Sequence, residues 1–400
     1  MRNFGVLYGF ELRKLVKRKL VWISTAILVV SSLIAFLSLL FGDYVVNGVR
    51  LDSNYNMVKK DMAFHKAMDG RILDDTLWSE VQEAFGKVDT SQPYFSTEEF
   101  SLYAWPYDPI RMMIASYTMI YYEETLQLSD VQTIYEVRQV MLEELWDELY
   151  LQEEEKEFWR QQEAKIKKPL VFGNMYGVRV LWNGMYSIGI MGLLVGIVCL
   201  SGIFPEEHTR KTDQLILCCK YGRKHIYWAK FWAGITVTLL QIMVCFIVVF
   251  VTSLEVYGSD GFSAAFWQTG FGYSYPLNMG EAMLIHYAMI LVAAIFTACL
   301  VMLLSEILHS SVGVIAIVAG VYMLPLFISI PDYYRVLSQI WSYLPSNFVG
   351  EWSVFSSRTL RVFGITLTSW QAVPVIYALL GCGAAFLGRR VFIRYQVRGR

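Results

Sequence analysis

The sequence predicts an all-α integral membrane protein with six transmembrane helices, an N-terminal interfacial elbow helix and a mainly helical extracellular domain inserted between the first two spans. Hydrophobic residues make up 55% of the 400 residues and charged residues only 17%, whereas soluble domains carry about a quarter charged residues. Several apolar runs reach the roughly 20 residues needed to cross the hydrocarbon layer. Because the runs show no alternating strand pattern, they are expected to be helices rather than strands of a closed barrel.

Six apolar runs carry no Asp, Glu, Lys or Arg near their centres, as the bilayer interior requires. The first run is too long for the apolar core of a cleavable signal peptide, and no small-residue cleavage site follows it, so it is expected to remain as an anchor. The expected spans are residues 21–41, 182–204, 228–254, 281–304, 312–330 and 371–392.

Lys and Arg residues gather in three segments, and this distribution predicts the orientation. The segments are the elbow at 1–20, the loop at 205–227 and the basic tail at 393–400. Six crossings place all three on the same face, which the positive-inside rule makes cytoplasmic. We therefore expect a multi-pass protein of the bacterial plasma membrane with both termini in the cytoplasm.

Residues 42–181 form the one soluble-looking block, with acidic residues in excess over basic ones. Ser129 and Gln132 fit a capping box that starts a helix, and an apolar stripe follows with glutamates opposite. Residues 153–168 are expected to continue as a solvated helix. The acidity fits attraction of a cationic substrate and fits an ordinary solvated surface equally. The stripe residues are Ile134, Val137, Met141, Leu145 and Leu149.

Two further exterior segments, 255–280 and 331–370, are rich in aromatic residues. Tyr and Trp favour the membrane interface, so these segments are either re-entrant or interfacial helices that cap the bundle, or parts of an outward gate. The sequence leaves both interpretations open.

The sequence shows no pattern typical of an enzyme or a metal protein. It lacks the phosphate-binding loop, the nucleophile elbow and paired metal-ligand spacings. Glu306 and His309 form an ExxH pattern, but it occurs once, so a simple turn is expected there. Ionisable groups are missing from the span centres, which disfavours an ion-coupled carrier. We therefore expect a non-enzymatic chain, with no cofactor or metal of its own, that draws energy from another subunit.

The polar stretch FPEEHTRKTDQLILCCKYGRKHIYWAK, residues 204–230, predicts a short cytoplasmic helix. Pro205 suits the first turn of a helix, where its missing N–H costs nothing. Glu206 and Glu207 then lie at the positive end of the helix dipole. The adjacent cysteines, Cys218 and Cys219, are interpreted as small semi-buried side chains because no second cysteine pair accompanies them.

This stretch resembles the first cytoplasmic loop of ABC-2 type transporter permeases. That loop typically reads as an aromatic residue, an acidic residue, a Thr, a small apolar run, an Arg and a Lys that enters the next span. The family usually has Gly before the Thr, where this chain has Lys211. The six-span layout and the basic elbow also fit the family. The matching loop residues are Phe204, Glu206 or Glu207, Thr212, Leu215, Leu217, Arg223 and Lys230, and the elbow residues are Phe10, Glu11, Leu12, Arg13 and Lys14.

The resemblance implies a membrane subunit that pairs with a second permease copy, as a homodimer or a heterodimer, and binds two cytoplasmic ABC ATPase subunits. ATP and Mg would then be bound by the ATPase and not by this chain. The loop would act as the coupling helix and the elbow would help to form the ATPase contact. Permeases with a large exterior insertion of this type often serve export of, or immunity to, antimicrobial peptides and lantibiotics. The implied ATPase-coupling residues are Glu206, Glu207, Thr212, Leu215, Arg223 and Lys230.

The leading hypothesis is a permease that moves an amphipathic peptide or lipid-like substrate outward. One rival keeps this layout and makes the chain a mechanotransmitter, in which ATP hydrolysis drives the extracellular domain to act on envelope partners. Another rival is a membrane receptor or scaffold with no ATPase. Membrane lipids are the remaining expected partners, and no nucleic acid is expected.

Overall fold

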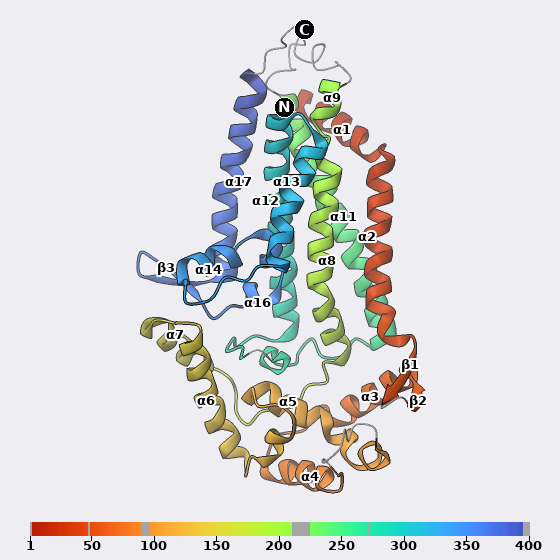
Figure 1. The fold of residues 1–400 in the computed structure, drawn as a ribbon, viewed down its shortest axis with the longest axis vertical. Helices are drawn as coiled ribbons and strands as arrows, with labels where there is room; N and C mark the ends of the chain where they lie inside the picture. Colours follow the sequence, from red (N-terminus) through yellow and green to blue (C-terminus); the bar gives the residue numbers. More distant parts are fainter. Residues whose placement is uncertain (1, 47–48, 90–96, 210–224, 271, 395–400) are drawn as a thin grey trace.

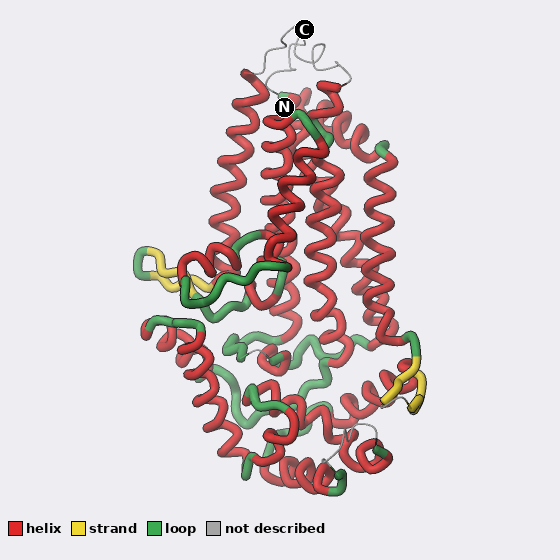
Figure 2. The backbone as a smooth tube through the Cα atoms, in the orientation of Figure 1, coloured by secondary structure: helices red, strands yellow, loops and turns green. Residues whose placement is uncertain are grey.

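The computed structural model describes residues 2–46, 49–89, 97–209, 225–270 and 272–394. These residues form an elongated molecule in which a bundle of long helices carries a smaller domain at one end (Figure 1). Helices predominate throughout (Figure 2). The start of α1 and the end of α17 lie together at the opposite end of the bundle, called here the terminal end.

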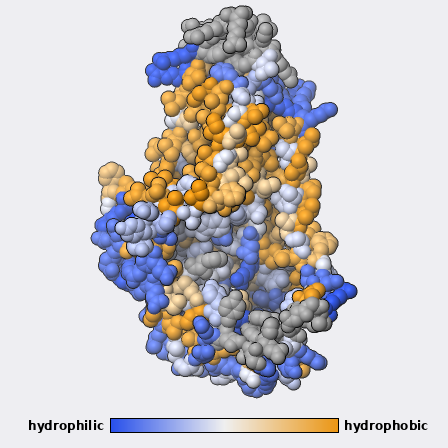
Figure 3. Space-filling view, in the orientation of Figure 1, coloured by the Kyte–Doolittle hydropathy of each residue, from blue (hydrophilic) through white to orange (hydrophobic). Residues whose placement is uncertain are grey.

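Five helices in the described residues are long and apolar enough to cross a membrane. Their side chains give the bundle a broad apolar band, flanked by polar surfaces at both ends (Figure 3). The chain is therefore a multi-pass membrane protein, as the sequence predicts. The five helices are α2 (Lys19–Leu37), α8 (Tyr176–Ser201), α11 (Ile226–Tyr257), α12 (Met279–Leu308) and α17 (Ser369–Arg394).

The sixth expected span, 312–330, is present as the shorter helix α13 (Ser311–Met323), which one 3-10 turn extends to Leu326. At 1.5 Å per residue, 13 residues cover only about 20 Å, less than the roughly 30 Å hydrocarbon core. The predicted count of six full-length spans is therefore not confirmed. α13 still runs from the terminal end back into the bundle, which lets α17 return to that end (Figure 1).

Helix α8 lies at the centre of the bundle and packs closely on α11. A Cβ at Gly192 would lie 2.8 Å from Cγ1 of Ile242, and one at Gly196 would lie 3.0 Å from Cγ2 of Thr238. Small residues at such points let two helix backbones approach each other closely, which favours association where lipid gives no hydrophobic drive. The glycines thus fix where α8 meets α11.

The elbow helix α1 (Arg2–Val16) packs its apolar side on α11. Leu15 is buried, Tyr8 and Leu12 pack against the core, and the Tyr8 hydroxyl lies 2.8 Å from Oγ1 of Thr236. Phe10 is exposed. The periodic apolar face of this helix therefore has a protein partner in the bundle.

The inserted domain has its own apolar core around α4, α5 and α6. Trp78 is 1% exposed, and its indole Nε1 donates a hydrogen bond to the carbonyl of Leu128 at 2.9 Å. A buried tryptophan is satisfied in this way because an unpaired N–H would be costly. The domain comprises β1 (Asp43–Val46), β2 (Val49–Ser53), α3 (Asn54–Met68), α4 (Asp75–Gly86), α5 (Asp108–Thr118), α6 (Val131–Glu148) and α7 (Glu153–Glu163).

Three local predictions for this domain are wrong. The N-cap of α6 is Asp130, not Ser129, and Gln132 donates to Glu136 rather than reaching back to the cap. Asp is as strong a cap as Ser, so a one-residue shift is easily made. The helix also ends at Glu148, and a capping box formed by Gln152 and Glu155 starts α7 as a separate helix. The buried stripe of α6 is Val131, Ile134, Arg138, Leu142 and Trp146, whereas Val137, Met141, Leu145 and Leu149 lie at its margin.

The buried position of Arg138 explains the shifted stripe. Its guanidinium donates to both Glu163 carboxylate oxygens, at 2.7 and 3.0 Å, and to the carbonyls of Tyr117 and Tyr273, at 2.6 and 3.1 Å. A charge at a core position is tolerated only when its donors are paired. A pattern of apolar residues alone does not identify such a position.

Two segments lie between the inserted domain and the bundle (Figure 1). Residues 258–278 contain one 3-10 turn, Phe266–Thr269, and bury Tyr273 and Tyr275. The second segment ends in a β-hairpin that the sequence did not predict, because four-residue strands show too little alternation. Its elements are α14 (Arg335–Ser342), α15 (Pro345–Phe348), α16 (Glu351–Val354), β3 (Thr359–Val362) and β4 (Ile365–Thr368).

Polar contacts fasten the inserted domain to this second segment. Glu155 of α7 forms an ion pair with Arg335 of α14 and accepts hydrogen bonds from the amide and hydroxyl of Thr359 at 3.0 and 2.9 Å. Burial raises the pKa of Glu155, but these donors and its capping amide outweigh burial and hold the pKa below its ordinary value. Nearby, Arg358 donates to the carbonyl of Leu149 at 3.0 Å. We call these contacts the Glu155 clamp.

Candidate coupling site

The predicted coupling and elbow residues meet at the terminal end of the bundle. Helix α8 ends at Ser201, and the short helix α9 (Pro205–Thr209) follows with Pro205 in its first position. The next described helix, α11, begins at Ile226. Helix α1 lies beside both (Figure 1). Three segments far apart in the sequence thus converge around one group of charged side chains.

Four of these side chains form a buried quartet of two carboxylates and two ammonium groups. Lys230 of α11 donates to Oε1 of Glu207 at 2.6 Å and to Oε2 of Glu11 at 3.2 Å. Lys14 donates to the same Glu207 oxygen at 2.8 Å and to Oε1 of Glu11 at 3.2 Å. Each ammonium thus bridges both carboxylates, and the formal charge of the quartet is zero.

Burial in the quartet is graded from the bundle toward its rim. The side chain of Lys230 is 1% exposed, Glu11 5%, Glu207 12% and Lys14 36%. Charges withdrawn from water to this extent persist because each has an opposite partner in contact, and removing one partner of a buried pair typically costs about 3–5 kcal/mol. The quartet therefore holds α1, α9 and α11 in one arrangement.

Outside the quartet, a second ion pair ties the elbow to α9. Arg18 lies 2.9 Å from Oε2 of Glu206, and the Glu206 side chain remains 43% exposed. Burial lowers the pKa of Lys14, but its hydrogen bond to Glu207 and the carboxylate charges outweigh burial and raise the pKa above its ordinary value. Lys14 therefore stays charged at the rim of the site.

Aromatic side chains pack beside the Lys230 end of the quartet. The Lys230 ammonium lies 5.8 Å from the ring centroid of Phe204, a cation–π distance. Phe204 stacks on Tyr227, whose hydroxyl donates to the carbonyl of Ala385 in α17 at 2.9 Å. The site is thereby connected to the last spanning helix as well.

Glu306, in the last turn of α12, is a buried acid whose environment the sequence did not reveal. Its residue is fully buried, and neither carboxylate oxygen has a hydrogen-bond partner in the described structure. His309 ends the helix in a left-handed conformation, φ 53°, so a turn does follow. The sequence marked Glu306 only through its ExxH pattern with His309, which predicts the turn but not the burial of the acid.

The structure brings together five of the predicted residues, Glu206, Glu207, Lys230, Glu11 and Lys14, and leaves others apart. Phe10 and Arg13 lie on the exposed side of α1. Thr212, Leu215 and Arg223 fall in 210–224, outside the described residues, so their roles stay predictions. Among the described residues, no group of three or more His, Cys, Asp or Glu is placed to hold a metal ion.

A bundle of long apolar helices with an inserted polar domain and a basic N-terminal helix defines a polytopic membrane protein. Residues 6–341 match the model of the ABC-2 family transporter proteins, so the chain belongs to that family. No curated protein and no solved structure matches it. The chain is thus a membrane transport subunit, not itself catalytic, of a family that generally works with ABC ATPase partners.

Proposed function

We propose that this chain is the permease subunit of an ABC exporter and couples ATP hydrolysis in a separate ATPase to outward movement of an amphipathic peptide or lipid-like substrate. Two permease copies and two ATPase subunits form the working complex, and the ATPase carries ATP and Mg. The terminal end faces the cytoplasm and the inserted domain faces outward. The excess of Lys and Arg near the terminal end supports this orientation.

The observation that carries the proposal is the position of the charge quartet. Glu207 lies shortly before the 210–224 segment and Lys230 shortly after it, and the two side chains are in contact. Glu11 and Lys14 join the elbow to the same contact. A force applied to the segment by an ATPase would therefore reach α1, α8 and α11 together, because separating these charges in a buried site is costly.

Purification of the permease from its native membrane, followed by identification of any ABC ATPase that co-purifies, tests the proposal. A double variant of the loop, Leu215→Asp with Arg223→Glu, is expected to lose the ATPase while the permease still inserts in the membrane. The control Glu144→Arg, at an exposed position of α6 in the inserted domain, should retain it. Retention of the ATPase and of its hydrolysis by the loop variant would refute coupling through this loop. Absence of any ATPase from the wild-type preparation would favour the receptor or scaffold.

The Glu155 clamp favours mechanotransmission as a second candidate function. It fastens the inserted domain to the segment that leads into α17, so motion of α17 would be delivered to that domain. Proteoliposomes that contain only the permease and its ATPase separate the two functions. An exporter accumulates a fluorescent amphipathic peptide in inside-out vesicles when ATP is added. A mechanotransmitter hydrolyses ATP there without moving the peptide.

A further inference from the structure

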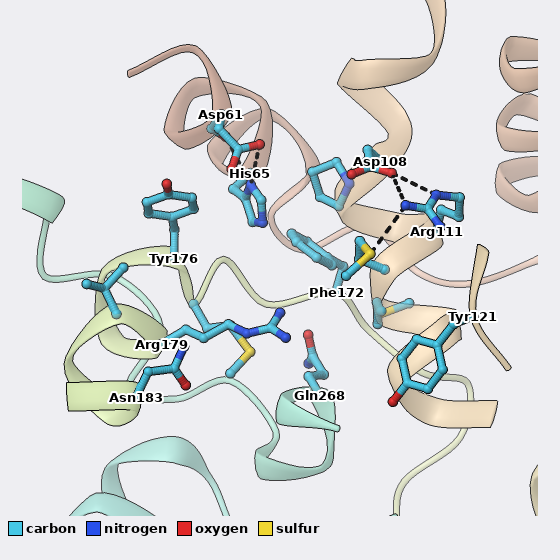
Figure 4. Close-up of a pocket in the computed structure, with 15 residues that line it drawn as sticks. Asp61, His65, Asp108, Arg111, Tyr121, Phe172, Tyr176, Arg179, Asn183 and Gln268 are labelled. Carbon is cyan, nitrogen blue, oxygen red and sulfur yellow. Dashed lines mark hydrogen bonds and ion pairs between the residues drawn. The ribbon is translucent and has the colours of Figure 1, made fainter. Parts of the chain in front are cut away.

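A cavity of about 530 Å³ lies where the inserted domain meets the start of α8. Its walls come from α3, α5, α8, the 3-10 turn at Phe266–Thr269 and the chain that links α7 to α8 (Figure 4). This volume is within the usual range for small-ligand sites. The cavity is separate from the charge quartet, which lies at the terminal end.

One cation in this cavity, Arg179, interacts with Asp61 and Tyr121 only through longer-range electrostatics. The guanidinium of Arg179 points into the cavity beside Gln268 (Figure 4), and no described residue forms a hydrogen bond or ion pair with it. An arginine presents five donors in a rigid fork that suits carboxylate and phosphate oxygens. A guanidinium that faces a cavity without such an acceptor is therefore a recognition group for an anion.

The other charged groups in the cavity wall are engaged with one another. Asp108 lies 2.6 Å from Arg111, whose side chain is only 4% exposed. Asp61 accepts a hydrogen bond from Trp105 at 3.2 Å and lies 3.7 Å from Nδ1 of His65. These contacts leave Arg179 as the group that is ready to bind a ligand.

The rest of the lining combines polar side chains, among them Gln268 and Asn183, with an adaptable apolar part. Met112 and Met113 from α5, Met175 before α8 and the ring of Phe172 surround the space near Arg179. Methionine side chains adjust to irregular apolar shapes. A ligand that fills this cavity therefore needs an anionic group and an apolar part.

The cavity lies where α8 passes from the inserted domain into its apolar run, the level at which lipid headgroups are expected. Arg179 is one helical turn before the apolar run of α8 that begins at Trp182. Asn183, one turn further along α8, lines the same cavity and is exposed, so the cavity is open where α8 enters the apolar band. An amphiphile in the membrane would reach Arg179 with its headgroup while its chain stays in the hydrocarbon layer.

We propose that this cavity binds the anionic headgroup of a membrane lipid, with Arg179 paired to its phosphate. The site uses the permease alone and does not depend on the ATPase coupling proposed above. Arg179 forms charge-assisted hydrogen bonds to the phosphate oxygens, and the methionines cover the first part of the acyl chains.

Native mass spectrometry of the delipidated full-length chain tests this site by titration with phosphatidylglycerol or phosphatidylcholine. Wild type is expected to prefer phosphatidylglycerol, and Arg179→Gln should lose roughly tenfold in its affinity, the usual effect of removing a charged hydrogen bond. Arg179→Lys should lose less affinity. Phosphatidylcholine carries the same phosphate beside a compensating choline cation, so its weaker binding should fall less in Arg179→Gln than phosphatidylglycerol binding does. Arg71→Gln, which removes a half-exposed arginine outside the cavity that is paired with Glu80, serves as the control.

A second variant and a competition measurement complete the test. Met112→Trp fills the cavity without changing its charge and should weaken phosphatidylglycerol binding as well. Soluble glycerol phosphate at millimolar concentration should fail to displace the lipid, and displacement would show that the site binds a free anion and not an amphiphile. Equal binding of both lipids by wild type, or an unchanged preference in Arg179→Gln, overturns the proposal.

Discussion

Replacing Lys230 by Met tests the charge quartet most directly. The substitution preserves the length of the side chain and removes the ammonium that contacts Glu207 at 2.6 Å and Glu11 at 3.2 Å. Both carboxylates then keep only Lys14, which is 36% exposed. Removing one partner of a buried pair costs about 3–5 kcal/mol, and the remaining contacts of Lys14 place the expected loss at about 3 kcal/mol, the lower end of that range.

The assay is the apparent Tm of the purified permease in nanodiscs, which should fall by several degrees. Lys17→Met is the matched control. Lys17 is exposed and lies directly after α1, so its substitution should change the Tm little. The double variant Lys230→Met with Glu11→Gln leaves one balanced pair, Lys14 with Glu207. It is therefore expected to be more stable than Lys230→Met alone, which a double-mutant cycle reports as a coupling energy.

Two results would refute this reasoning about the quartet. A Tm of Lys230→Met equal to that of Lys17→Met would show that the buried ammonium adds nothing to stability. A double variant less stable than the single one would show that Glu11 acts independently of Lys230.

Three further predictions concern other parts of the chain. Glu306→Gln should raise the apparent Tm at pH 9 more than at pH 6, because the buried acid has no hydrogen-bond partner among the described residues and destabilises the fold where it is ionised; an equal gain at both pH values would refute this. Gly192→Leu should destabilise the bundle by about 1–3 kcal/mol through overpacking against Ile242, while Gly320→Ala, where nothing lies within 4 Å, should not. Because the folded pKa of Glu155 is lowered, its ion pair stabilises the protein above the unfolded value of about 4.5 and is lost as pH falls below it; Tm measured from pH 7 to pH 3.5 should therefore drop more steeply in wild type than in Glu155→Gln.

The sequence predicted the apolar helices well because hydrocarbon imposes the same length and composition on every span. It predicted α13 poorly, because the span was defined by hydropathy alone, although Pro325 inside the run 312–330 lacks the N–H that a continuing helix needs. The hydropathy of a segment shows that it can lie in the membrane. The length of its helix also depends on whether each residue can keep the helical backbone hydrogen bonds. The same limit explains why two helices were predicted as one across 149–152.

For the candidate site, the sequence identified the correct residues but not their mutual contacts. Glu11, Glu207 and Lys230 were each selected within a local pattern, and the contact of Lys230 with Glu11, 219 positions away, exists only in the folded bundle. Arg179 was not selected at all, because a single arginine before a span reads as an ordinary flanking charge. The cavity around Arg179 is built by five segments that are separate in the sequence, so its lack of a hydrogen-bonded acceptor is visible only in the folded structure.

The contact between Glu11 and Lys230 also has a consequence for biosynthesis. The two residues are 219 positions apart, so at about 5–20 residues per second the ribosome needs roughly ten seconds or more to supply the lysine after the glutamate. Lys14, three positions from Glu11, is available from the start. Before α11 is made, Glu11 of the elbow helix can therefore pair with Lys14 at the membrane surface. The elbow reaches its final position only after α11 has entered the membrane and Lys230 can contact Glu11.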